Sequence, residues 1–125
     1  MRLLIIFLLT SVTFMAQARY EVTVKNTATE SDSLQLNGLH IVGVRVASNF
    51  NGDSLYVLTA DSLDGDYTRV YTANDGEYLG FVAEPGQRYI LNPPDYYFFE
   101  KYIKLESNTA ADAEQTHIVY LGNYK

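Results

Sequence analysis

The chain of 125 residues contains no cysteine and no tryptophan, and it has only two histidines. The absence of cysteine excludes a disulfide scaffold, a thiol nucleophile and any zinc site that uses cysteine. His40 and His117 are too few for a multi-histidine metal centre within one chain, and we expect each to make an ordinary hydrogen bond at a strand edge. None of the seven serines lies in a G-x-S-x-G motif, so we expect no enzymatic activity, no bound metal and no cofactor.

Positive charge is also scarce, because nine Lys and Arg residues face fifteen Asp and Glu residues, for a formal charge of −6. Neutralising phosphates requires clustered positive charge, so we expect no binding to nucleic acid. The hydrophobic content of 47% is that of a globular protein, and the length allows a single domain.

The N-terminus has the pattern of a secretory signal peptide. Arg2 gives a positive start, residues 3–9 are all apolar, and Ala16-Gln17-Ala18 is a small-x-small cleavage site. The apolar run is shorter than the roughly 20 residues of a membrane span. We therefore interpret residues 1–18 as a leader for export or membrane insertion, cleaved after Ala18, and residues 19–125 as the domain. The alternative is a buried strand or helix of the fold itself.

From Tyr20 onward the sequence predicts short strands, because apolar and polar residues alternate in brief stretches. Val42, Val44 and Val46 are predicted to share one face of a strand, opposite Ile41. Residues 55–59 are expected to be buried on both sides. Further strands are predicted at residues 68–72, 77–83, 87–91, 102–106 and 117–121. Residues 110–115 alone have a local helical pattern, and residues 27–32 are predicted to be a loop.

Glycine-containing dipeptides separate these strands, and each predicts a turn with positive φ at glycine. They are Asn37-Gly38, Asn51-Gly52, Asp64-Gly65, Asp75-Gly76 and Pro85-Gly86. About eight to ten short strands at this spacing predict an all-β fold, an antiparallel two-sheet jelly roll or β-sandwich.

Asp61, Asp64 and Asp66 surround Gly65 and could offer oxygen ligands to Ca²⁺. However, Leu63 stands where a calcium loop of the EF-hand type needs an oxygen ligand, and no bidentate Glu follows at the required offset. A hairpin turn between strands that end near Ala60 and begin near Tyr67 is the simpler interpretation.

Residues 95–102 contain five aromatic side chains in eight positions: Tyr96, Tyr97, Phe98, Phe99 and Tyr102. Exposed tyrosines can stack on sugar rings or anchor a protein interface, and a phenylalanine could instead close the end of the sandwich. We expect one phenylalanine in the core and exposed tyrosine at Tyr96 or Tyr97. These five residues are our candidates for an interface or a ligand-stacking site.

The order of motifs over about residues 38–121 resembles a family of small phage virion proteins, of the head-decoration or head-fibre type. The motifs are Ser54-Leu55-Tyr56-Val57, Asp61-Ser62-Leu63-Asp64-Gly65, Asp75-Gly76-Glu77-Tyr78, Leu91-Asn92-Pro93 and Tyr102-Ile103-Lys104-Leu105-Glu106-Ser107. The resemblance implies a discoidin-like or jelly-roll sandwich displayed in copies on a capsid or fibre, and it implies no catalytic residue. Lys101 and Glu106 depart from the family only in surface charge.

Two functions follow as expectations. The first is a non-enzymatic virion structural protein that decorates a capsid or forms a spike or head fibre. Its partners would be capsid or other virion proteins and copies of itself in a trimer or pentamer, with a host surface glycan as a further partner. The leader departs from the family, because tailed-phage capsid proteins assemble in the cytoplasm, but it fits a virion with a lipid membrane. The alternative is an exported bacterial carbohydrate-binding or adhesion domain, secreted or periplasmic, that uses Tyr96 and Tyr97.

Overall fold

The computed structural model describes residues 18–72, 76–91 and 101–123, and within these ranges the regular elements are all β-strands. In chain order they are β1 (Ala18–Val24), β2 (Leu34–Gln35), β3 (His40–Arg45), β4 (Ser54–Ala60), β5 (Thr68–Arg69), β6 (Tyr71–Thr72), β7 (Glu77–Tyr78), β8 (Gly80–Val82), β9 (Arg88–Ile90), β10 (Tyr102–Ser107) and β11 (Gln115–Gly122). β1 begins at the last residue of the predicted leader, whose residues 1–17 lie outside the described ranges. This part of the chain contains no helix that could cross a membrane.

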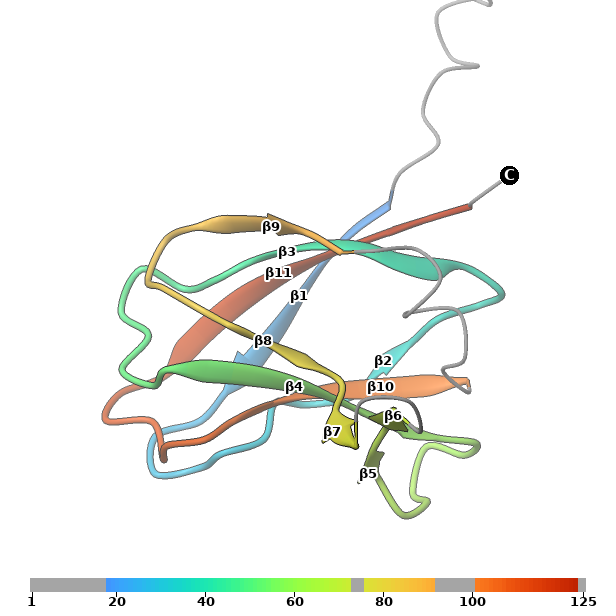
Figure 1. The fold of residues 1–125 in the computed structure, drawn as a ribbon, viewed down its shortest axis with the longest axis horizontal. Helices are drawn as coiled ribbons and strands as arrows, with labels where there is room; N and C mark the ends of the chain where they lie inside the picture. Colours follow the sequence, from blue (N-terminus) through green and yellow to red (C-terminus); the bar gives the residue numbers. More distant parts are fainter. Residues whose placement is uncertain (1–17, 73–75, 92–100, 124–125) are drawn as a thin grey trace, which may run out of the picture.

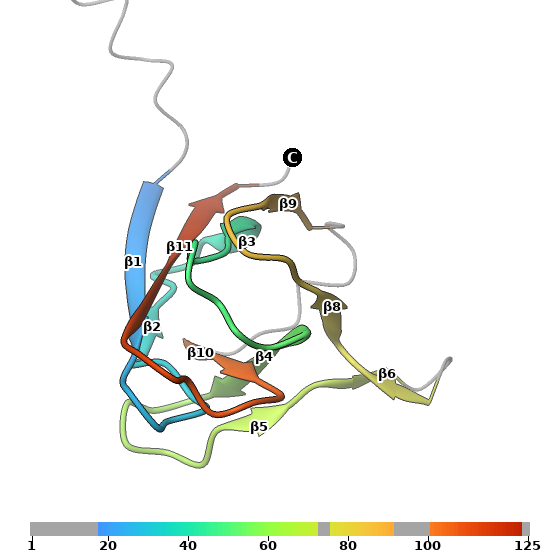
Figure 2. The ribbon, with the colours of Figure 1, turned by 90° about the vertical axis from the view of Figure 1, so that its left-hand side faces the viewer.

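The strands form two antiparallel sheets that face each other, which confirms the predicted β-sandwich (Figure 1). The first sheet has the order β1-β11-β3-β9. The second has the order β2-β10-β4-β5. β8 also pairs with β4, on the same edge as β5: β8 pairs with residues 54–56 of β4, and β5 pairs with residues 58–59. Strands β6 and β7 form a separate two-stranded ribbon that extends sideways from the sandwich (Figure 2).

The hydrophobic core lies between the two sheets, because alternate side chains of each strand point inward. Ile41, Leu55, Ile103, Leu105 and Leu121 are its largest fully buried aliphatic residues. On β4 the burial extends to the outer face, where Leu58 and Ala60 are also inaccessible to solvent. The prediction that this strand is buried on both sides is therefore confirmed.

One predicted face is wrong on β3, and a β-bulge is the reason. Gly43 pairs with Tyr120 and Ile41 pairs with Leu121, so Val42 has no opposite residue on β11. The extra residue reverses the alternation. Ile41 consequently points into the core, while Val42 is only half-buried.

Residues 110–115 do not form the helix that their local pattern indicated. The backbone N–H of Ala111 donates to the carbonyl of Ala28, and its carbonyl accepts from the N–H of Thr27, both at 2.8 Å. These bonds to a distant loop satisfy the groups that a helix would pair internally. β11 then begins at Gln115, in extended conformation.

The glycine turns are formed in two different ways. Gly38, Gly76 and Gly86 have the predicted positive φ, but Gly52 and Gly65 do not. At Gly65 a Cβ atom would lie 2.7 Å from the rotatable hydroxyl oxygen of Ser62 and 3.2 Å from its backbone carbonyl oxygen, so glycine relieves a tight contact. The requirement there is close approach of neighbouring groups and not the left-handed backbone.

Ser31 provides a first test of this architecture, because its side chain bonds the loop before β2 to the backbone of β10. The hydroxyl oxygen accepts the buried N–H of Leu105 at 3.0 Å and donates to the carbonyl of Asp32 at 2.8 Å. Ser31→Ala leaves that N–H unpaired, so we expect the free energy of unfolding to fall by about 1–3 kcal/mol in urea titrations. The exposed Ser48→Ala is the control and should change it by less than about 0.5 kcal/mol. Equal losses in both variants would contradict this role.

Candidate functional site

The predicted aromatic cluster is only partly within the described residues. Tyr96, Tyr97, Phe98 and Phe99 lie outside them, so their role stays a prediction. Tyr102 is the first residue of β10, half-buried, with its side chain on the outer face of the sheet between Gln35 and Ala60.

Asp61, Asp64 and Asp66 form an exposed turn between β4 and β5. The two strands pair antiparallel through Leu58 with Arg69 and Thr59 with Thr68, as a hairpin requires. Within the described ranges, no group of three or more His, Asp or Glu residues could hold a metal ion. The hairpin interpretation of Asp64-Gly65 is thus confirmed.

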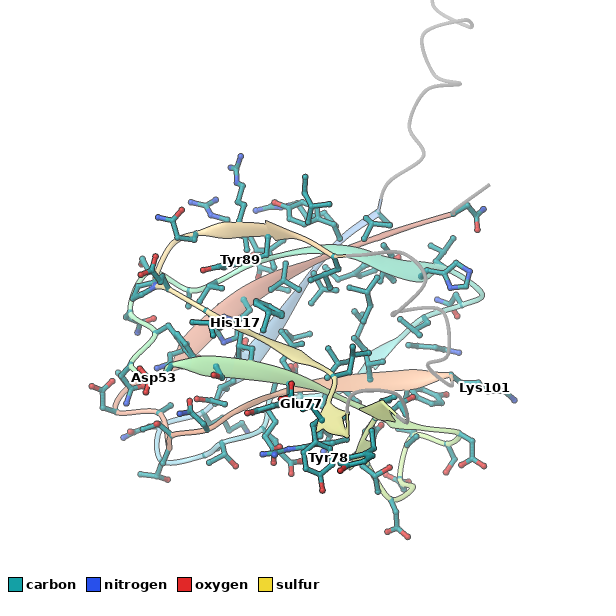
Figure 3. The ribbon with its side chains drawn as sticks, viewed as in Figure 1. Asp53, Glu77, Tyr78, Tyr89, Lys101 and His117 are labelled. Carbon is teal, nitrogen blue, oxygen red and sulfur yellow. The ribbon has the colours of Figure 1, made fainter. Side chains whose placement is uncertain are left out.

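His117 lies on β11 between β1 and β3, and its side chain is fully buried between the sheets (Figure 3). The prediction of a strand-edge position is therefore wrong. Its Nδ1 accepts the backbone N–H of Ala47 at 2.9 Å, and its ring meets Phe50 edge-on with centroids 5.7 Å apart. Nε2 is the one buried side-chain nitrogen or oxygen in the described segments without a hydrogen-bond partner. Burial lowers the pKa of His117 from 6.5 to about 4, so the ring is neutral at pH 7.

His117 should make stability depend on pH. Because its pKa is lower in the folded state, the unfolded chain binds more protons between about pH 4 and pH 6.5. The stabilisation is complete above pH 6.5 and is lost as the pH falls toward 4, by about 3 kcal/mol in total. We expect His117→Asn, whose amide oxygen can still accept the N–H of Ala47, to lose this part of the pH dependence. Urea titrations at both pH values measure it, and His40→Asn is the control that should keep it.

A hydrophobic edge of the sandwich is exposed where β8 and β9 follow each other along the chain. Ile90 is 94% exposed and Val82 is 74% exposed, and we call these two residues the β8–β9 edge. Each strand is the last of its sheet on this side. The rings of the preceding residues, Phe81 and Tyr89, pack with centroids 4.9 Å apart and lie against the hydrophobic core.

A polar groove lies on the outer face of the second sheet. Leu58 forms its floor, and its lining includes Tyr67, Tyr78, Arg69 and Glu106. With Glu30 and Thr68 these residues line an open groove of about 370 Å³, and we call this set the tyrosine groove. Nε of Arg69 donates to a carboxylate oxygen of Glu106 at 2.6 Å.

Cations and aromatic rings stack in layers along this groove. The Arg69 guanidinium lies 4.1 Å from the ring centroid of Tyr56 and 5.1 Å from that of Tyr78. Lys104 lies 4.4 Å from the ring centroid of Tyr67, and its Nζ is 3.6 Å from a carboxylate oxygen of Glu30. At exposed sites each such contact contributes about 0.5–1 kcal/mol, which favours these side-chain positions.

Sequence reasoning missed both surfaces. The tyrosine groove combines residues from five segments of the chain, so no local motif could reveal it. One signal was present, because the pairing of β6 with β7 places Tyr71 opposite Tyr78. The exposure of Ile90 follows from the edge position of β9, which alternation alone does not predict.

Comparison with known proteins identifies relatives in fold only. No protein-family model and no curated protein matches the sequence. Among solved structures, the SPBc2 prophage-derived protein YomS is similar, with 9% identity and a TM-score of 0.51 over 88% of this chain and 97% of that chain. A phage-derived protein therefore has a similar all-β fold.

Two other solved structures are similar at lower scores. The Drosophila NLP core has 15% identity and a TM-score of 0.40, covering 86% of this chain and 99% of that chain. The Yersinia pseudotuberculosis-derived mitogen has 12% identity and a TM-score of 0.40, covering 87% and 86%.

Proposed function

We propose that this protein is a non-enzymatic structural protein of a virion, which serves as a subunit of a capsid decoration, spike or head fibre. The observation that carries the proposal is the likeness of its whole sandwich to a prophage-derived protein, YomS. The resemblance of its motifs to small phage virion proteins supports the same conclusion. In this proposal the protein lies on the virion surface, and its leader directs export or membrane insertion.

The surface chemistry supports a role through contacts. The fully buried His117 bonds to the backbone and contributes to the core, and the three aspartates of the β4–β5 turn point to solvent. The β8–β9 edge, by contrast, presents large aliphatic side chains on strands whose outer sides have no neighbouring strand in the described sheets. Exposed apolar residues at open sheet edges are typical places for contacts between subunits.

The β8–β9 edge makes self-association testable. We expect a homo-oligomer, a trimer or pentamer, whose contact is apolar and therefore persists at high salt. Ile90→Asp places a charge in this contact and should weaken association by at least about tenfold. Sedimentation velocity at micromolar concentration measures it.

Leu63→Asp is the matched control, because Leu63 is also an exposed aliphatic residue but lies in the β4–β5 turn. It should leave the sedimentation coefficient unchanged. A wild-type chain that is strictly monomeric and absent from purified particles would contradict both the oligomer and the virion assignment.

The leader is tested by intact-mass measurement of the native protein. We expect the mass of a chain that begins at Arg19, because Ala16-Gln17-Ala18 fits a signal-peptidase site. A mass that includes residues 1–18 would contradict cleavage. A cytoplasmic protein without membrane association would contradict targeting as well.

The alternative function, an exported carbohydrate-binding or adhesion domain, is favoured by one feature. The tyrosine groove combines aromatic rings with paired carboxylates and cations, which are the groups that sugars contact. A glycan site on this groove would be the main functional surface of such a domain.

A further inference from the structure

We infer that the tyrosine groove is a binding site for a neutral carbohydrate, with Tyr78 as the stacking platform and Arg69 and Glu106 as the hydrogen-bonding pair. The inference does not depend on the virion assignment. It uses other residues than the sequence pattern indicated, because residues 96–99 lie outside the described ranges.

Tyr78 has the exposure and the rigidity of a stacking platform. The side chain is 49% exposed, and Figure 3 shows it on the outer side of the second sheet. The Arg69 guanidinium stacks over its ring at 5.1 Å, and the ring of Tyr71 packs against it edge to face with centroids 5.1 Å apart. These two contacts restrict the rotation of the side chain, and a sugar would stack on the part of the ring that stays exposed. The C–H face of a pyranose packs well on such an apolar, flat surface.

The ion pair at the base of the groove supplies polar partners for sugar hydroxyls. The Arg69 guanidinium carries five N–H donors in a planar fork, and the Glu106 carboxylate accepts several hydrogen bonds. Their mutual bond of 2.6 Å holds both groups in a defined orientation. A sugar hydroxyl both donates and accepts, so a vicinal diol can bond to this pair in a way that an apolar ligand cannot.

Charge balance defines the class of sugar. Arg69 and Lys104 contribute two positive charges, and Glu30 and Glu106 contribute two negative charges, within two ion pairs on one face. The two carboxylates would repel a phosphate or an acidic sugar. A neutral pyranose carries no charge and is not repelled. The volume of about 370 Å³ is within the range of small-molecule sites, about 300–1,000 Å³. A mono- or disaccharide is therefore the expected ligand.

The experiment is an NMR titration of the full chain with four neutral disaccharides: maltose, cellobiose, lactose and N,N′-diacetylchitobiose. We expect at least one of them to shift the backbone amides of Tyr67, Arg69, Tyr78 and Glu106, with a millimolar dissociation constant. Tyr78→Ala should weaken that binding by about tenfold. Tyr20→Ala is the matched control, because Tyr20 is a partly exposed tyrosine on the other sheet.

Glu106→Gln separates ligand binding from a structural role of the groove, because it keeps the shape of the side chain and removes its charge. We expect weaker sugar binding with an unchanged pattern of amide shifts elsewhere in the sandwich. The inference is overturned if none of the four sugars shifts these amides at about 20 mM. It is also overturned if the shifts persist unchanged in Tyr78→Ala, or if only phosphate or N-acetylneuraminate produces them. Sedimentation of Tyr78→Ala should match the wild type, so either proposal can fail without the other.

Discussion

The pairing of β11 with strands on both of its sides is the constraint on which the rest of the structure depends. β11 is bonded to β1 along seven residue pairs and to β3 on its other side. Its inward side chains continue the core with Val119 and Leu121, and they also carry two buried polar groups, Gln115 and His117. Without this strand the first sheet would separate into β1 and the β3–β9 pair.

The polar residues of β11 attach the long loop between β3 and β4. His117 accepts the N–H of Ala47, while the amide of Gln115 donates to Asn51 at 2.5 Å and to the carbonyl of Asn49 at 3.3 Å. A buried polar group without a partner is costly, so these bonds select one conformation of the loop. The loop in turn positions β4, which carries the floor of the tyrosine groove on its outer face.

Most of the fold could be predicted from the sequence because it depends on local patterns. Alternation at Val22, Val24 and along β4 indicated the strands, and the Asp64-Gly65 turn indicated the β4–β5 hairpin. Three features depended on partners far along the chain and could not be predicted. They are the bulge opposite Val42, the extended backbone at Ala111, and the tyrosine groove, in which Arg69 meets Glu106 from another strand. His117 shares a face of β11 with Val119 and Leu121 and is a core residue, although its polar ring suggested a strand edge.

The pairing of the first and last strands has a consequence for how the protein is made. Thr23 on β1 and Thr116 on β11, whose hydroxyls lie 3.3 Å apart, are separated by 93 positions. A sheet with such distant partners has a high contact order, so closing it costs much chain entropy and proceeds slowly. β11 is synthesised after β1, β3 and β9, so the first sheet can close only once β11 has emerged from the ribosome. Until then β1 and β3 lack the strand that joins them, and their open edges can pair wrongly with another chain.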